Sequence, residues 1–197
     1  MNKLDLTSEQ EKKLNKFIKD SRELLVTAFH NYAIWWFYKS EREKYFKVLK
    51  KYEGFFSESI YAHFVAMLLS LTSFLDKSSE KYNSIYSYID YLQRNSFLLK
   101  KSFSRIDEEM NKLSPYVKKL MILRNNIYAH QSSKINSDDA FKKADLVYDD
   151  FISVIQSIAA IIEIIEADLI QSKFYYMIGS TTSDLEDILV SLKNNVH

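Results

Sequence analysis

The sequence predicts an all-α protein of about five to seven helices, because two features disfavour sheets and favour long helices. Among 197 residues there are only two glycines and one proline, whereas β-rich chains need many such turn residues. Apolar side chains recur three and four positions apart along several long segments, which is the spacing of one helix face. With 47% apolar residues the chain can fill a sizeable core, and we expect one domain over residues 1–197.

The first helix is expected to follow Ser8 as its N-cap residue, because Glu11 three positions later completes a capping-box pattern. We expect it to extend past four consecutive aromatic residues, 35–38, into the Lys/Glu-rich sequence that ends before Gly54. Four adjacent rings on a helix cannot all face one core, so some must contact another element, a partner chain or a ligand. A wide core or a dimer interface is the favoured interpretation, and base stacking is the alternative.

Helices are also expected over 55–75, 84–94 and 97–113, from their apolar stripes. His63 has no metal-ligating residue three or four positions away, so we interpret it as a packed or surface histidine. Ser114-Pro115 is typical of a helix start, and the sequence leaves open whether 97–130 is one kinked helix or two. A long buried helix is predicted over 139–171, and Ser183 with Glu186 predicts a final helix to about Lys193.

The composition excludes several classes of protein. The absence of cysteine rules out disulfides, thiolate zinc sites and cysteine nucleophiles. The N-terminus begins no apolar run, so no signal peptide is expected. The most apolar stretch, 151–165, contains Gln156 and Glu163 and is shorter than a membrane span of ~20 residues. We therefore expect a cytoplasmic protein with no membrane contact, no metal and no cofactor.

Charge is distributed unevenly along a chain of net charge +1. Residues 100–143 carry ten basic and five acidic side chains, a net charge of +5, and residues 144–197 carry two basic and nine acidic ones, a net charge of −7. The basic segment could attract a nucleic-acid backbone. Pairing of basic and acidic faces between adjacent helices explains the same pattern.

The basic segment contains the most chemically suggestive motif, Leu-Arg-Asn-Asn-Ile-Tyr-Ala-His over residues 123–130. Arg124 and His130 are six residues apart, which on an unbroken helix is ~240° around the axis and ~9 Å along it. The two side chains converge only if the helix ends near Ala129 or if a second copy of the chain supplies the partner. Asn126 lies four residues before His130 and could fix the tautomer of its imidazole.

These residue types suit metal-free cleavage of RNA. Histidine exchanges protons near neutral pH, and arginine binds a phosphate through two parallel hydrogen bonds and stabilises developing negative charge. The structural alternative is that Arg124 and His130 are two cations that stabilise the C-terminal end of a helix.

At Arg124-Asn125-x4-His130 the sequence resembles the HEPN superfamily. The segment 64–76 upstream and Ser84-Ile85-Tyr86-Ser87 make it most similar to the abortive-infection AbiU-type branch, over roughly residues 55–165. The resemblance implies an up-and-down helical bundle with this stretch as its core. Residues 1–53 have no clear counterpart in the resemblance and are expected to form a helical extension, and residues 172–197 are expected to form a C-terminal helix. The resemblance also implies a homodimer whose two motifs share one groove, and a metal-independent endoribonuclease of toxin–antitoxin or phage-defence systems.

Carried over to this chain, the resemblance makes Arg124 the phosphate-binding residue, His130 the acid/base and Asn125 the residue that positions Arg124 or the substrate. RNA is the implied substrate, and an antitoxin or another defence protein is a further expected partner. Ser132 stands where some HEPN toxins carry a tyrosine that is modified, so that form of regulation is not expected. The alternative function is a non-catalytic helical module that binds a nucleotide or a partner protein. Substrate-binding roles are expected for five neighbours of the motif: Asn126, Tyr128, Lys118, Lys119 and Lys134.

Overall fold

The computed structural model describes residues 7–77, 84–98, 100–129, 137–169 and 180–195. All regular structure in these ranges is helical, which confirms the predicted fold class. The helices follow in the order α1 (Ser8–Ser40), α2 (Phe46–Lys51), α3 (Glu53–Leu75), α4 (Ile85–Arg94), α5 (Lys100–Ala129), α6 (Ser137–Ala144), α7 (Tyr148–Leu169) and α8 (Ser180–Asn194).

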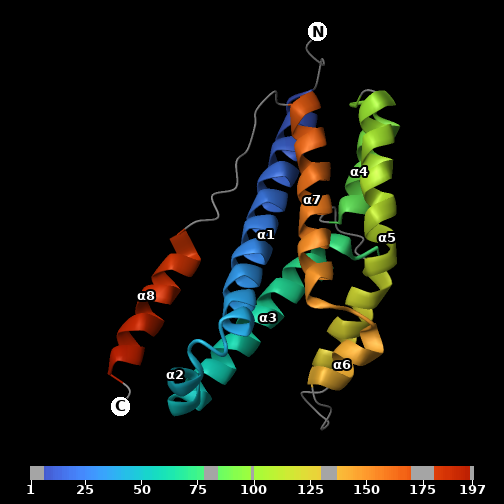
Figure 1. Ribbon diagram of the computed structural model, residues 1–197. Helices are drawn as coiled ribbons and strands as arrows, with labels where there is room; N and C mark the ends of the chain where they lie inside the picture. Colours follow the sequence, from blue (N-terminus) through green and yellow to red (C-terminus); the bar gives the residue numbers. More distant parts are fainter. Residues whose placement is uncertain (1–6, 78–83, 99, 130–136, 170–179, 196–197) are drawn as a thin grey trace.

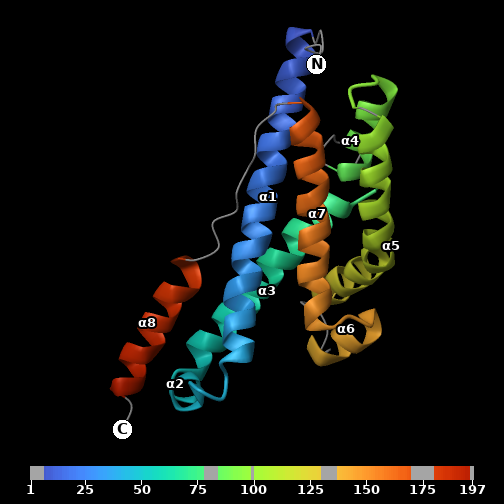
Figure 2. The same cartoon turned by 45° about the horizontal axis from the view of Figure 1, so that its top comes forward.

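Four long helices form the bundle. Helix α1 packs along α3 and α7, and α5 packs on the opposite side of α7 and against α6 and α3. Figures 1 and 2 show α7 between α1 and α5, with α3 crossing behind them. Helix α8 lies apart from the other long helices, beside α2 and the end of α1. Because α7 has neighbours on both sides, it is buried nearly all round, as the run of isoleucines predicts.

One ion pair crosses the core between α1 and α7. Nε of Arg22 donates to Oε1 of Glu166 at 2.6 Å, and the Glu166 side chain is 1% exposed. A carboxylate buried to this degree needs a cation beside it, because desolvation otherwise favours its neutral form. This pair therefore ties the acidic C-terminal segment, residues 144–197, to the first helix.

The aromatic row at 35–38 fills the interior, as the favoured interpretation predicts. Trp35 and Tyr38 are buried, while Trp36 and Phe37 are half-buried. The rings divide between two clusters: Trp35 packs in the main core, and Tyr38 packs in a smaller core that α8 helps to close. Because the row contacts two separate cores, the four adjacent rings can pack against apolar neighbours without sharing one face of α1.

Several helix boundaries predicted for the N-terminal part of the chain are wrong. Thr7 caps α1 and forms the capping box with Gln10, one residue before the predicted pair. The helix ends at Ser40, so the sequence up to Lys51 folds back as a turn and the short α2. Gly54 does not end a helix, since it lies in the first turn of α3.

The predicted long helix at 139–171 is also wrong, because two helices occupy this region. Asp145 follows α6 with φ of 54°, a left-handed conformation that a helix cannot contain. Helix α7 then starts anew, with the Asp150 carboxylate accepting from the backbone N–H of Val147 at 2.8 Å. Helix α8 begins at Ser180, so the predicted cap at Ser183 lies inside it.

The question left open for 97–130 has a definite answer. Residues 100–129 form one helix, α5, with Pro115 inside it. Proline removes one backbone hydrogen bond and bends a helix without ending it when neighbours hold both halves. The axis of α5 changes direction partway along its length (Figure 2). The bend turns the motif-bearing end of α5 toward α6.

Helix α3 is long and apolar enough to cross a membrane on those two criteria, the one such helix among the described residues. Yet 44% of its most apolar window is buried within the bundle, where it packs along α1, as a core helix does. His63 on this helix lies with Nδ1 2.8 Å from Oδ1 of Asn31 on α1. Burial lowers the pKa of His63. The histidine is therefore a packing residue between two helices, as expected.

Candidate functional site

Residues 123–129 of the motif lie in the last two turns of α5, where three elements meet, and His130 lies outside the described residues. Arg124, Asn125 and Asn126 are carried by this end of α5, which also contacts α3 and α6. Asp76 caps the C-terminal end of α3 close by. The tertiary fold thus brings a carboxylate, an arginine and two amides to one place.

Two contacts hold the guanidinium of Arg124. Its Nη1 lies 3.2 Å from Oδ2 of Asp76, and its Nε donates to Oδ1 of Asn125 at 3.3 Å. The side chains of Arg124 and Asp76 are each 26% exposed, so the pair is accessible to solvent from one side. Within the described residues, Nη2 of Arg124 forms no hydrogen bond. The guanidinium of an arginine carries donors along two edges. The guanidinium is therefore oriented while part of its donor capacity remains for an anion.

Asn126 is engaged with two neighbours. Its Nδ2 donates to the carbonyl oxygen of Ile122 at 2.6 Å, and its Oδ1 accepts from Nζ of Lys143 on α6 at 3.2 Å. These contacts place a second cation, Lys143, next to the motif. The predicted hydrogen bond from Asn126 to His130 falls outside the described residues, because His130 itself does.

The lysines assigned to substrate binding have different surroundings. Lys119 donates to the backbone oxygen and the carboxylate of Asp145, at 2.6 and 2.7 Å, and this pairing raises the pKa of Lys119 and lowers that of Asp145. Lys119 thus fixes the link between α6 and α7. Lys118 is exposed on α5, Tyr128 lies in its last turn, and Lys134 is outside the described residues.

Sequence reasoning missed Asp76 and Lys143. Residue 76 is 48 positions from Arg124, and no periodicity connects them. Lys143 follows Asn126 by 17 positions and belongs to the segment that was predicted to be the start of one long helix. Its only sequence-level indication is its place in the basic stretch 100–143. Among the described residues, no group of three or more His, Cys, Asp or Glu side chains could hold a metal ion.

An all-helical bundle with an Arg-Asn…Ala-His motif at the end of a core helix defines a protein of the HEPN class. The chain belongs to the AbiU2 family of HEPN proteins, since the model of that family matches residues 11–187. The match extends well beyond the segment 55–165 on which the resemblance rests, and includes most of α1 and part of α8. Comparisons with curated proteins and with solved structures each found no match. The chain therefore has an abortive-infection type of HEPN domain.

Proposed function

We propose that the protein is a metal-independent endoribonuclease of the abortive-infection type, which acts in the cytoplasm in phage defence or growth arrest. The observation that carries the proposal is the Arg124 guanidinium, oriented between Asp76 and Asn125 at the end of α5, six residues before His130. Membership of the AbiU2 family supports it. An oriented, partly exposed arginine six residues before a histidine in the sequence suits phosphate chemistry better than a helix-stabilising role does.

In the proposed reaction the ribose 2′-oxygen attacks the adjacent phosphorus. His130 takes the proton from the 2′-OH, and the bond from phosphorus to the 5′-oxygen breaks. The leaving 5′-oxygen receives a proton from an imidazolium, and the products are a 2′,3′-cyclic phosphate and a 5′-hydroxyl. Arg124 binds the non-bridging oxygens and stabilises the charge that develops on them. Lys143, bonded to Asn126, adds positive potential beside that position.

A second copy of the chain completes the proposed site. On an unbroken helix Arg124 and His130 would be ~240° apart around the axis and would not share one face, so a histidine from a second copy is the proposed partner of Arg124. Two copies that face each other across a two-fold axis would provide two arginines, and two histidines to serve as base and acid. RNA is the proposed substrate, and an antitoxin or another defence protein is the proposed regulator.

The direct test is cleavage of RNA by the purified protein in EDTA. We expect cleavage to persist in the chelator and to fall by ~10²-fold or more in His130→Ala, which removes the general acid/base. The cleavage products, separated on a sequencing gel, should carry cyclic phosphate ends. Loss of activity in EDTA, or full activity of His130→Ala, refutes the proposal. A wild-type protein that is inactive on RNA but forms a tight protein complex indicates the non-catalytic module.

Asp76 is expected to act as a positioning residue for Arg124. The Asp76→Asn variant keeps an oxygen acceptor but removes the charge that holds Nη1, so we expect kcat to fall about 10-fold with little change in KM. A purely structural role predicts instead a loss of folded protein with kcat per folded molecule unchanged.

The chain contains a matched control for this variant. Asp90 and Arg94 form a comparable acid–arginine pair on the surface of α4, at 2.8 Å, distant from the motif in sequence. Asp90→Asn removes the same charge and should leave kcat and KM at wild-type values. Equal kinetics for the two variants contradict a positioning role for Asp76.

A further inference from the structure

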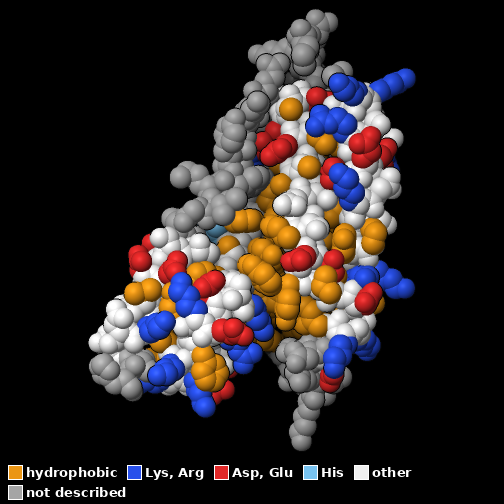
Figure 3. Space-filling model, in the orientation of Figure 1, with side chains coloured by type: hydrophobic (Ala, Val, Ile, Leu, Met, Phe, Trp, Pro, Cys, Tyr) orange, Lys and Arg blue, Asp and Glu red, His pale blue; other side chains and the backbone are white. Residues whose placement is uncertain are grey.

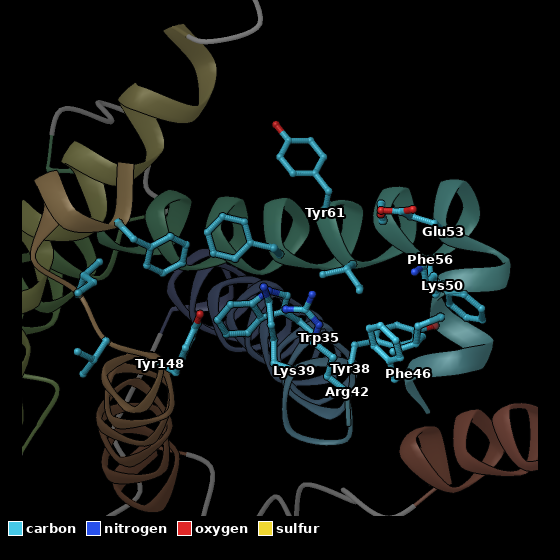
Figure 4. Close-up of a pocket in the computed structure, with 17 residues that line it drawn as sticks. Trp35, Tyr38, Lys39, Arg42, Phe46, Lys50, Glu53, Phe56, Tyr61 and Tyr148 are labelled. Atoms are coloured by element: carbon cyan, nitrogen blue, oxygen red, sulfur yellow. The ribbon is translucent and has the colours of Figure 1, made fainter. Parts of the chain in front are cut away.

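A groove of about 710 Å³ lies on the face of the bundle shown in Figure 3, away from the end of α3 that carries Asp76. The end of α1, the short α2, the first turns of α3 and the link between α6 and α7 form its walls. Figure 4 shows side chains from all of these elements directed into one space, with Tyr61 above it and Tyr148 at one end. Neither the proposed cleavage reaction nor the family match accounts for this groove.

Exposed apolar side chains gather at the groove. Among the described residues, eight large hydrophobic side chains are exposed, and four of them line this space. Val147 is the most exposed of the four, at 62%. The others are Phe46, Tyr61 and Tyr148. The surface view shows a hollowed band of hydrophobic side chains between the α8 side and the α7 side (Figure 3). Such a concentration on a soluble surface is typical of an interaction site.

The rim of the groove is positively charged. Lys39, Arg42 and Lys50 line it, with Glu53 as the single carboxylate. In the part of the chain that the structure describes, none of these three cations forms an ion pair, whereas Lys44 nearby is paired with Glu186. Lys39, from the last turn of α1, and Arg42, from the turn that follows it, line the groove and are labelled in Figure 4. Three unpaired cations around an apolar floor favour an occupant with negative charge and an apolar face.

The floor of the groove fits an apolar helix face better than it fits nucleotides. Its lining includes aliphatic side chains, Leu49, Ile60 and Leu146, and no asparagine or glutamine. RNA bases need hydrogen-bonding partners for their edges or open ring faces. The aliphatic part of the lining supplies neither and would leave base edges unpaired, although the exposed rings of Phe46, Tyr61 and Tyr148 could stack on a base as well as contact an apolar helix. An amphipathic helix, by contrast, places apolar residues in such a groove and keeps its charges at the rim.

The chain already binds one acidic amphipathic helix on the adjoining surface. Leu189 of α8 belongs to the same small apolar cluster as Tyr38 and Phe56, which also line the groove. Its Glu186 accepts from Nζ of Lys44 at 2.7 Å and from the hydroxyl of Tyr45 at 3.3 Å. This arrangement lowers the pKa of Glu186. The corner of α1, α2 and α3 is therefore suited to this type of helix on one side, and the groove repeats the same chemistry without an occupant from the described residues.

We propose that the groove is a docking site for an acidic amphipathic helix of a partner protein. Apolar side chains spaced three and four residues apart would enter between Phe46, Tyr61 and Tyr148. Carboxylates on the flanks of that helix would pair with Lys39, Arg42 and Lys50. This site is separate from Arg124, so the proposal does not depend on RNA cleavage.

The test is selection from a displayed library of random 16-residue peptides on the full-length His130→Ala protein. We expect enrichment of peptides with acidic residues and helical apolar spacing. Affinity is then measured for one enriched, fluorescently labelled peptide. Reversal of all three charges, in Lys39→Glu, Arg42→Glu and Lys50→Glu combined, should weaken binding at least about 10-fold. Glu53→Lys, which removes the opposing charge, should tighten it two- to threefold.

Lys47→Glu on α2 is the matched control, because Lys47 is exposed but does not line the groove, and it should bind as the wild type does. Absence of enrichment, or enrichment of basic or uncharged peptides, overturns the proposal. Binding that survives the triple reversal but is lost in Lys44→Glu also overturns the proposal, because the peptide would then have replaced α8. Two further outcomes apply if no peptide binds. If the triple reversal abolishes binding of a single-stranded RNA, the groove serves RNA. If it dissociates a dimer, the groove serves a second copy of the chain. All the substituted side chains are exposed, and circular dichroism confirms that the variants fold.

Discussion

Replacement of Arg124 by alanine is expected to lower RNA cleavage by about 10²–10³-fold, the usual effect of removing one donor that stabilises developing charge. The expectation follows from the way the guanidinium is held, by the Asp76 carboxylate and by the Asn125 side chain. A phosphate that enters the site meets an arginine already oriented. The loss should appear in single-turnover rates measured in EDTA with saturating protein.

Arg124→Lys separates orientation from charge. Lysine keeps the positive charge but cannot bond to Asp76, Asn125 and a phosphate through one planar group. We therefore expect a rate between those of the wild type and Arg124→Ala. The folded state should be little affected, because ion pairs that are accessible to solvent contribute about 1 kcal/mol or less to the free energy of unfolding. Arg94→Ala on α4 breaks a surface pair and serves as the control.

Two results would contradict this account of Arg124. Equal activity of Arg124→Ala and the wild type would show that the arginine only stabilises the end of α5. A large loss of stability in Arg124→Ala, seen in urea unfolding, would attribute any loss of cleavage to unfolding rather than to chemistry.

The largest expected effect on stability is that of Trp35→Ala. Trp35 is 2% exposed and joins three helices, with its ring 5.3 Å from that of Phe64 on α3 and 5.7 Å from that of Phe151 on α7. Truncation of a buried tryptophan typically costs 3–5 kcal/mol, because it removes apolar contacts and leaves a cavity. We expect the midpoint of urea unfolding to fall accordingly, with the slope of the transition unchanged.

Trp36→Ala is the internal control for that substitution. Trp36 is half-buried and contacts Tyr148, at 5.7 Å between ring centres, near the surface. Its removal should cost less than half as much as that of Trp35. Equal losses for the two variants would show that the aromatic row acts as one unit rather than dividing between core and surface.

The helical class and the position of the motif follow from local properties of the chain. Glycine and proline are scarce, and apolar residues recur at helical spacing. These two features specify a helix wherever the spacing continues without interruption, as in α3 and α7. Residue types and spacing alone predict Arg124 and its neighbours as the candidate site. The family resemblance, which rests on this motif and on the segments 64–76 and 84–87, agrees with the match over residues 11–187.

Helix boundaries depended on interactions that sequence periodicity does not contain. The α6–α7 break occurs at Asp145, whose left-handed backbone is held by Lys119, 26 positions earlier. Pro115, which typically begins a helix, lies inside α5, because packing against neighbouring helices outweighs one lost hydrogen bond. In both places the deciding partner is remote in the chain, so local reasoning could not find it.

The sequence by itself determined that the protein is helical and where its arginine, asparagine and histidine lie along one segment. Only the tertiary structure decided what surrounds them. Asp76 reaches Arg124 from α3, and Lys143 reaches Asn126 from α6, because the bundle brings three helix ends together. Spacing along a helix fixes which residues share its face, whereas contacts between helices depend on how their apolar faces pack.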